Sequence, residues 1–131
     1  MNVFEDKEGP GFQYSIGFFR SFKHPEVLIF GQQRNVMHGM LTRIADGIRE
    51  GKQYAAGTEA EDILDGYRCV FRIVPSKLVP EYLGFANWFY DYKEFSVVQC
   101  IWPDREGRFP WDSEASEELR RREPVLDSIN T

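Results

Sequence analysis

The sequence predicts a single α+β domain with a small, mostly antiparallel sheet of about four to six strands and two packed helices. Three observations lead to this class. A length of 131 residues suits one domain with its own core. Short apolar or alternating runs, typical of strands, are interleaved with two longer segments whose apolar residues recur every three or four positions. The resulting order of elements is β-β-α-β-α-β.

The expected domain covers residues 12–112. Residues 1–11 are polar and contain glycine, so they are expected to be a flexible N-terminus. Residues 113–131 form a charged C-terminal extension, with a short helix at about 114–122 and a frayed tail after Pro124. No internal repeat and no linker to a second domain is present in the sequence.

Four segments are expected to be strands. Residues 12–18 alternate in part between apolar and polar side chains, and residues 67–74 alternate with arginines on one side. Residues 27–30 and 95–102 are continuous or nearly continuous apolar runs. A continuous apolar run is typical of a strand that is buried on both faces, so residues 27–30 and 95–102 are expected at the centre of the sheet.

Two helices are expected, over residues 35–50 and 78–90, with a polar loop at 52–66 that contains at most a short helical turn. The first helix has an apolar stripe formed by Met37, Met40, Leu41, Ile44 and Ile48. Asn35 is its expected N-cap, and Gly51 is its expected left-handed stop. Gly39 and Gly47 weaken it by up to about 1 kcal/mol each relative to alanine, which close packing against another backbone would explain.

Composition limits the classes of partner. The net charge is −5 and no basic run occurs, so binding to long nucleic acid is not expected. A small anion remains compatible, because one or two arginines can hold a phosphate. A basic protein partner and a homo-oligomer are compatible as well. Aromatic residues make up 15% of the chain, which is enough for some rings to line a cleft.

The cysteines and the N-terminus indicate a cytoplasmic protein. Cys69 and Cys100 lie in apolar runs without a CxxC spacing, so buried free thiols are expected. The charged N-terminus has no apolar signal region, and no segment reaches the roughly 20 apolar residues of a membrane span. Only His24 and His38 are available as histidine ligands, so no metal site and no cofactor are predicted.

The first candidate site is the turn His24-Pro25-Glu26. A histidine and a carboxylate at this spacing can form an acid/base pair or supply two metal ligands. The structural interpretation is favoured, in which His24 bonds to the backbone and Glu26 caps a loop or meets an arginine. Tyr14, on the first strand, can present its hydroxyl to a ligand, although a half-buried tyrosine is the commoner outcome.

The second candidate site is the loop of residues 102–112. Its rings and arginines are Trp102, Arg105, Arg108, Phe109 and Trp111. Rings offer flat surfaces to a purine or flavin, and arginines offer forks to a phosphate, so this loop can form one wall of a nucleotide-like site. In the alternative, the tryptophans close one end of the core and the arginines pair with local acids.

Two groups of motifs, taken together, resemble a known family. The first group is Tyr14-Ser15-Ile16-Gly17, His24-Pro25-Glu26 and Phe30-Gly31; the second is Trp102-Pro103-Asp104 and Gly107-Arg108-Phe109-Pro110-Trp111. Between them, Gly51, Gly57, Gly66-Tyr67 and Tyr82-Leu83 lie at matching positions. Over about residues 12–112 the chain resembles the domain-of-unknown-function family numbered 4262, small proteins of bacteria and some phages. The resemblance implies no activity, but it implies that the tyrosine, the His-Pro-Glu turn and the Trp-Pro-Asp loop gather around one feature.

These observations favour a non-catalytic binding module that holds a small aromatic or nucleotide-like anion in one cleft. The expected ligand-binding residues are Tyr14, His24, Glu26, Trp102, Asp104, Arg105, Arg108 and Trp111. A phage protein with such a cleft could sequester a signalling nucleotide of its host. The hypothesis requires the loop of residues 102–112 to fold back beside the turn that carries His24.

Two other classes remain open. An immunity or antitoxin-like protein would use the acidic segment of residues 58–65 against a basic protein partner. A small flavin-binding or hydrolytic enzyme is the third class, and a hydrolase would use His24 with Glu26 or Asp104. Ser15 lies in no nucleophile elbow and Gly17 lies in no phosphate loop, so no catalytic residue is predicted.

Overall fold

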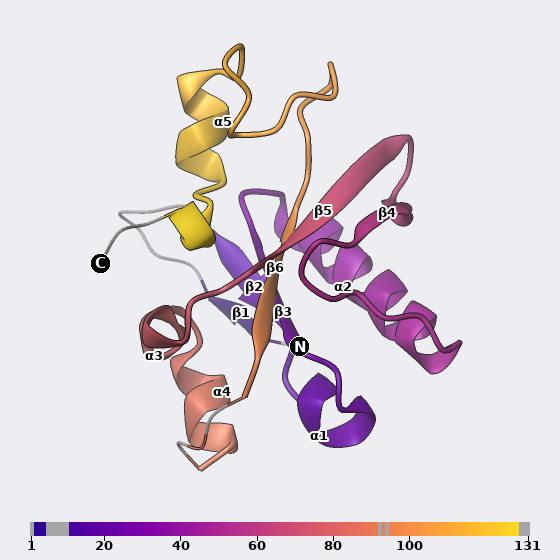
Figure 1. Ribbon diagram of the computed structural model, residues 1–131, viewed down its shortest axis with the longest axis vertical. Coiled ribbons are helices and arrows are strands. Elements are labelled where there is room, and N and C mark those ends of the chain that lie inside the picture. Colours follow the sequence, from indigo (N-terminus) through magenta and orange to yellow (C-terminus); the bar gives the residue numbers. More distant parts are fainter. Residues whose placement is uncertain (1, 5–10, 92, 94, 129–131) are drawn as a thin grey trace.

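Six strands form one sheet in the order β1-β2-β3-β6-β5-β4 in the computed structural model, which describes residues 2–4, 11–91, 93 and 95–128 (Figure 1). The strands are β1 (Asn2–Phe4), β2 (Phe12–Tyr14), β3 (Glu26–Phe30), β4 (Glu59–Leu64), β5 (Tyr67–Ile73) and β6 (Val97–Ile101). Strands β3 and β6 are parallel, and the other neighbours are antiparallel. The fold is therefore α+β with a mostly antiparallel sheet, as predicted.

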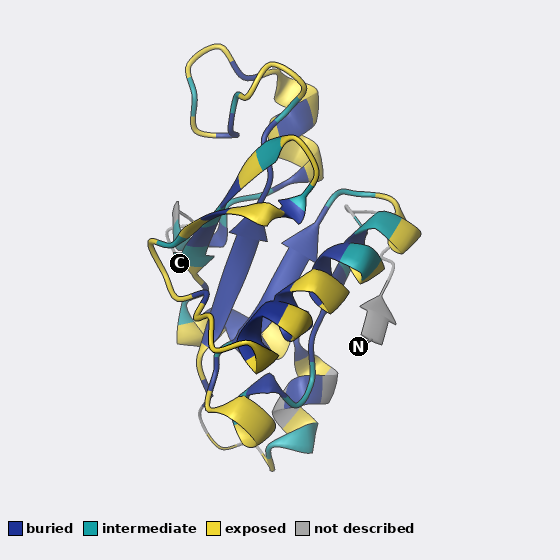
Figure 2. Cartoon of the chain, turned by 90° about the vertical axis from the view of Figure 1, so that its right-hand side faces the viewer, coloured by how far each residue is buried: buried dark blue, intermediate teal, exposed yellow. Residues whose placement is uncertain are grey.

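Helices cover both faces of this sheet. They are α1 (Phe18–Phe22), α2 (Arg34–Arg49), α3 (Val79–Tyr82), α4 (Gly84–Phe89) and α5 (Glu117–Arg122), with 3₁₀ turns at Ser76–Leu78 and Leu126–Ser128. Figure 2 shows α2 with its buried side turned to the sheet and its exposed side outward. Alternate residues of β3 pack on opposite faces: Ile29 lies in the core under α2, and Leu28 lies in the core with α3 and α4.

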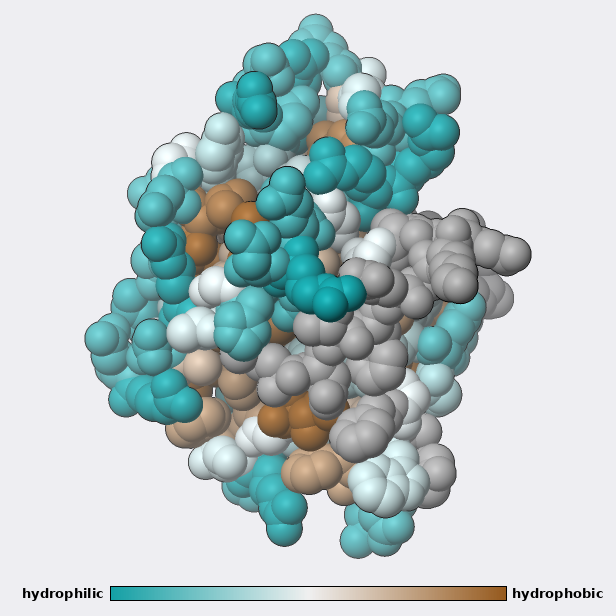
Figure 3. Space-filling model, turned by 180° about the vertical axis from the view of Figure 1, so that it is seen from behind, coloured by the Kyte–Doolittle hydropathy of each residue, from teal (hydrophilic) through white to brown (hydrophobic). Residues whose placement is uncertain are grey.

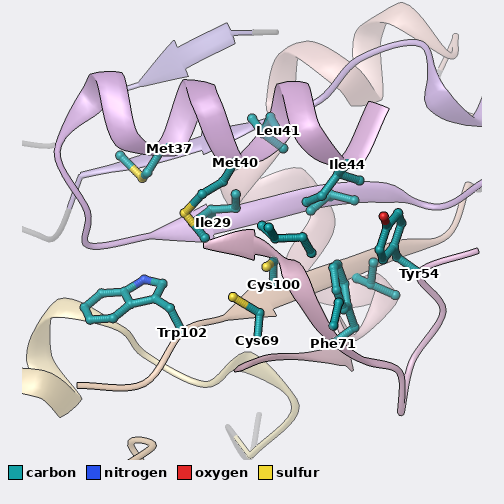
Figure 4. Packing of buried hydrophobic residues seen from close by; sticks show 14 of the residues in the cluster. Ile29, Met37, Met40, Leu41, Ile44, Tyr54, Cys69, Phe71, Cys100 and Trp102 are labelled. Carbon is teal, nitrogen blue, oxygen red and sulfur yellow. The ribbon is translucent and has the colours of Figure 1, made fainter. Parts of the chain in front are cut away.

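The two central strands and the longest helix agree with their local patterns. All five residues of β3 and of β6 are buried, which explains their continuous apolar runs. The predicted apolar stripe of α2 packs on Ile29, Cys100 and Phe71 (Figure 4). Gly51 has a φ of 96° and stops the helix as expected, but the N-cap is Gln33 rather than Asn35. Cys69 and Cys100 are free and buried.

Three expectations for regular structure were wrong. The first strand ends at Tyr14, and residues 18–22 form α1 instead. Residues 59–64, expected in a loop, form β4, which pairs with β5 through Ala60 and contains a bulge. The helix expected at 78–90 is broken at Leu83, whose backbone has φ −117° and ψ 46°.

Both ends of the described chain take part in the fold. Residues 2–4, which belong to the segment expected to be a flexible N-terminus, form β1 and pair with β2, while residues 5–10 lie outside the described part. Leu126 is fully buried in the core beside α3 and α4, so no frayed tail begins at Pro124. The side chain of Gln99 fixes this segment, because it donates to Pro124 O (2.6 Å) and accepts from Leu126 N–H (3.0 Å).

Replacing the two glycines inside α2 by alanine is expected to change the free energy of unfolding in opposite directions. A Cβ at Gly47 would overlap the hydroxyl of Tyr54, a buried ring, whereas a Cβ at Gly39 would meet nothing within 4 Å. We expect Gly39→Ala to raise the free energy of unfolding by about 0.5–1 kcal/mol, because alanine is the better helix former. We expect Gly47→Ala to lower it by about 1–3 kcal/mol, because overpacking outweighs that gain. Urea denaturation of the two variants checks the pair; equal effects would contradict the overlap.

Candidate functional site

The two candidate sites lie at opposite ends of the sheet. Strands β3 and β6 run parallel, with Glu26 opposite Val97. His24 comes just before β3, whereas Trp102 comes just after β6, and Trp102 Nε1 donates to the carbonyl oxygen of Phe30 at the far end of β3 (2.7 Å). Figure 1 places the loop after β6 at the top and α1 at the bottom. The prediction that all eight residues line one cleft was therefore wrong.

Glu26 is an internal anchor. It is fully buried at the start of β3. Its carboxylate accepts hydrogen bonds from Ser15 Oγ (2.6 Å), from the N–H groups of Gly17 (2.9 Å), Phe18 (3.1 Å) and Phe19 (3.2 Å), and from the Tyr90 hydroxyl. Burial, with the bond to Glu26, raises the pKa of Tyr90 to about 12, so that hydroxyl keeps its proton. The Tyr-Ser-Ile-Gly and His-Pro-Glu motifs thus meet to hold the first turn of α1.

His24 has no ring nitrogen available to a ligand. Its Nδ1 lies 2.7 Å from Pro25 O and its Nε2 lies 2.9 Å from Tyr54 N, so Nδ1–H donates and Nε2 accepts. Burial lowers the pKa of the imidazole, and the side chain is 4% exposed. The structural interpretation therefore accounts for His24. Tyr14 is fully buried in the core beside Leu28, away from the surface.

Asp104 and Arg108 shape the loop after β6. The carboxylate of Asp104 accepts from Glu106 N–H (3.0 Å) and Arg108 N–H (2.8 Å), which closes a tight turn. Arg108 lies 3.5 Å from both Asp104 and Glu106 and donates to Glu114 O (3.2 Å). Arg108 thus pairs with local acids, which is the alternative that the sequence left open for this residue.

Trp111 belongs to a stack of aromatic rings and guanidinium groups. The rings of Phe109 and Trp111 are parallel, with centroids 4.9 Å apart. Arg68 lies over Phe109 (5.4 Å) and Arg72 lies over Trp111 (4.8 Å), so arginines cover the outer ring faces. The sequence analysis missed the two arginines as partners, although their alternation on residues 67–74 placed them on one side of a strand.

A pocket of about 420 Å³ opens where β3 and β6 end, between the first turn of α2 and α5. We call it the β3–β6 pocket. The residues that give it its chemistry are Gln32, Tyr67, Trp102, Arg105, Glu118 and Arg122. A second hollow of about 320 Å³ adjoins it and shares Tyr67, Pro103 and Arg105. The two hollows form a groove with Arg105 and Tyr67 at its middle.

The two arginines of the pocket differ in their contacts. Arg122 donates from Nε (3.1 Å) and Nη2 (2.7 Å) to Gly31 O and lies 5.4 Å from the Trp102 ring centroid. Gly31 must be glycine here, because its φ is 85° and the backbone of Arg122 fills the space of a Cβ. Arg105 is exposed and forms no ion pair or side-chain hydrogen bond within the described residues. It is the guanidinium that remains available to an anion.

The structure thus brings together three of the predicted residues, Trp102, Asp104 and Arg105, as lining of one pocket. Tyr14, His24 and Glu26 lie elsewhere. Sequence reasoning missed Tyr67 and Arg122. Tyr67 belongs to the Gly66-Tyr67 motif, which was a usable signal, whereas Arg122 lay in a segment expected to stay outside the domain.

A buried carboxyl group adjoins the pocket. Glu123 is fully buried, and its Oε1 accepts from Trp102 N–H (2.7 Å), while its Oε2 has no partner among the described residues. Burial raises the pKa of this carboxyl well above its usual value. The hydrogen bond from Trp102 N–H to this carboxyl fastens the end of α5 to the end of β6.

Comparison with known proteins identifies the family and no activity. No helix within the described residues combines the length and the hydropathy of a membrane span. The described residues also contain no cluster of three or more His, Cys, Asp and Glu side chains that could hold a metal ion. No curated protein and no solved structure gives a significant match to the chain. One family model matches residues 1–116, and because this match spans most of the chain, the protein belongs to the family described as Domain of unknown function (DUF4262).

Proposed function

We propose that this protein is a non-catalytic binding module that holds a small aromatic or nucleotide-like anion in the β3–β6 pocket alone, without the cleft beside His24 that the sequence-based hypothesis required. The observation that carries the proposal is Arg105, a guanidinium without a partner among the described residues, beside the half-buried ring of Tyr67. Ligands commonly bind outside the carboxyl ends of parallel strands, which is where this pocket lies.

The lining supports an anion that carries a flat ring. Arg105 can form two parallel hydrogen bonds with a phosphate or carboxylate, and Tyr67 offers a stacking surface. The pocket borders the first turn of α2, a helix of 16 residues whose N-terminal dipole adds partial positive charge. The contacts of Arg122 with Gly31 and Trp102 hold the wall between these groups.

The candidate catalytic groups already form hydrogen bonds within the fold, which favours a binding function over hydrolysis. His24 uses both ring nitrogens within the fold, and Asp104 uses its carboxylate to close a turn. An acid/base mechanism needs such groups within reach of a substrate. We place the protein in the cytosol, because its two cysteines are free and buried, as expected for a reducing compartment.

Most acids of residues 58–65 are already paired within the fold, so this segment gives little support to the alternative of a basic protein partner. Glu59, Asp62 and Asp65 form ion pairs with Arg68, Lys52 and Arg43, respectively. Of the acids at 58–65, only Glu61 has no such pair within the described residues. A stable stoichiometric partner in a pull-down from the source cell would favour an immunity or antitoxin-like role instead.

The proposal predicts that nucleotides protect the protein against heat and that Arg105→Gln reduces this effect. A ligand present at about 100 times its Kd stabilises the folded state by about 2.7 kcal/mol, which raises the Tm by several degrees. We expect Arg105→Gln to weaken binding by about tenfold or more, because a charge-assisted hydrogen bond is lost. Thermal unfolding with a panel of nucleoside mono- and diphosphates measures both effects.

Arg121→Gln is the matched control for this experiment. It removes the same charge from an exposed position on α5 that does not line the pocket. We expect this variant to bind like the wild type. A Tm that no nucleotide shifts at millimolar concentration would overturn the proposal, and so would equal binding by the Arg105 variant and the wild type. Flavin-type absorbance of the purified protein would point instead to a cofactor.

A further inference from the structure

A further hollow lies between α1 and α4, at the end of the sheet opposite the β3–β6 pocket. It has a volume of about 350 Å³, and we call it the α1–α4 cleft. The residues used below are Phe19, Arg20, Lys23, Phe89, Tyr90 and Lys93, all of which line it. Figure 3 shows brown apolar patches in the lower part of the molecule, above a hydrophilic lower edge, and a further patch higher on the left, whereas the upper end is mostly hydrophilic.

The walls of the cleft are held in place by the Glu26 anchor. The same carboxylate accepts from the first turn of α1 and from the Tyr90 hydroxyl that follows α4. Tyr90 also accepts from Arg20 N–H (3.3 Å), and its ring packs edge-on against Phe19 (5.8 Å). The spacing between α1 and α4 is therefore set before any ligand arrives, which lowers the entropic cost of binding.

The rim of the cleft is positive although the whole chain is negative. Arg20, Lys23 and Lys93 line it together with one acid, Asp91, while the net charge of the protein is −5. Arg20 lies over the Phe89 ring at 5.5 Å. Neither lysine side chain forms an ion pair or hydrogen bond within the described residues. The ammonium groups of Lys23 and Lys93 are thus available to a ligand, beside the aromatic rings that line the cleft.

The backbone of Lys23 caps α1 and so fixes the position of this lysine at the rim. Its φ is 56°, in the left-handed region that glycine and asparagine adopt at lower cost. Its N–H donates to Phe19 O (3.0 Å), so the conformation ends α1 and fixes where the side chain leaves the backbone. The cap of α1 thus also sets where the Lys23 ammonium group stands at this rim.

We propose that the α1–α4 cleft binds a carboxylate that is joined to an aromatic ring. The ring packs against Phe19, Phe89 and Tyr90, and the carboxylate meets Lys23 and Lys93. Each lysine supplies a compact positive charge with three rotatable donors, which can pair with a carboxylate. Such a ligand is either a free aryl carboxylate or the C-terminal aromatic residue of a peptide. The proposal concerns a different site from the β3–β6 pocket and does not depend on it.

A ¹H–¹⁵N NMR titration of the full chain with 2-naphthylacetate tests the proposal. We expect saturable shifts of the backbone amides of α1, α4 and Lys93 at millimolar concentration. The uncharged analogue 2-naphthylethanol should bind at least about fivefold more weakly, as expected for the loss of the two exposed ion pairs with Lys23 and Lys93. Acetyl-Gly-Gly-Phe serves as the second probe: if it binds the same amides more tightly than 2-naphthylacetate, the source is a peptide terminus.

Lys23→Asn is the decisive variant, because asparagine keeps the left-handed backbone while removing the charge. We expect it to weaken binding of 2-naphthylacetate by about fivefold or more. Arg121→Gln, at the other end of the molecule, should leave the affinity unchanged (Figure 1). Equal affinity of the wild type and the Lys23 variant would overturn the proposal. Shifts that are absent with both probes, or that cluster at the β3–β6 pocket, would overturn it as well.

Discussion

Glu26→Ala is expected to lower the free energy of unfolding by about 3–5 kcal/mol, because it leaves several buried donors without an acceptor. The donors are the N–H groups of Gly17, Phe18 and Phe19 and the hydroxyls of Ser15 and Tyr90. The truncation also opens a cavity at a fully buried position. The loss should be visible as a lower midpoint in urea with an unchanged slope.

Two further variants separate the anchor from a general packing effect. Glu26→Gln keeps the volume but turns an NH₂ group toward backbone donors, so we expect it to recover only part of the lost stability. Ser15→Ala removes one donor, and Val27 N–H then loses its acceptor Ser15 Oγ (2.9 Å), so a loss of about 1–2 kcal/mol is expected. If Glu26→Ala unfolds within about 1 kcal/mol of the wild type, the anchor does not stabilise the fold in the way described.

Glu123→Ala is expected to lower the free energy of unfolding by about 2–4 kcal/mol. Trp102 N–H would lose its acceptor in a buried environment, and a cavity would form between α5 and β6. Because Arg122 and Leu119 line the β3–β6 pocket from the same helix, nucleotide binding should weaken together with stability. Chemical denaturation and the thermal assay with nucleotides measure the two consequences.

The pH dependence of Glu123→Gln gives a sharper test of the same group. Burial raises the pKa of this carboxyl in the folded state above that in the unfolded chain. The folded state therefore binds the proton more tightly, and its stabilising contribution is complete below an unfolded pKa of about 4.3 and is lost as pH rises through the folded pKa. Glutamine keeps an oxygen acceptor for Trp102 N–H and carries no charge at any pH.

We therefore expect Glu123→Gln to gain stability over the wild type as pH rises from 5 to 8. His24 changes in the opposite sense: burial lowers its pKa, so its contribution is lost as pH falls. Both proteins contain His24, so their difference isolates Glu123. Urea unfolding of the two proteins at several pH values supplies the measurement. A constant difference across this range would refute the assignment of a neutral buried carboxyl.

The parts of the fold that could be predicted have patterns that depend on neighbours in sequence. Helix α2 repeats its apolar residues every three to four positions, and β3 and β6 are apolar except for Glu26 and Gln99. Helix α1 could not be predicted in this way, because its first turn is held by Glu26 from another element. Strand β4 carries three glutamate and aspartate residues, and its strand character comes from pairing with β5.

Only part of the candidate site was predicted, again because the prediction relied on neighbours in sequence. Residues close in sequence, Trp102 and Arg105, were placed correctly in one pocket. Their supposed proximity to His24 depended on how two distant strands pair, which the local pattern does not report. The continuous apolar runs of β3 and β6 did hold a signal, because such runs are typical of parallel neighbours, and parallel pairing separates the start of one strand from the end of the other.

The position of β6 has a consequence for biosynthesis. β6 is the last strand in the chain, yet it lies between β3 and β5, and Glu26 and Val97 are separated by more than half of the sequence. On a translating ribosome, the units β1-β2-β3 and β4-β5 therefore have no shared strand between them until residue 101 has emerged, although α2 packs on both. Each unit meanwhile presents an open strand edge, and such edges are prone to aggregation. We expect nascent chains that stop before β6 to depend on chaperones, and refolding of the full chain to be slow for its size.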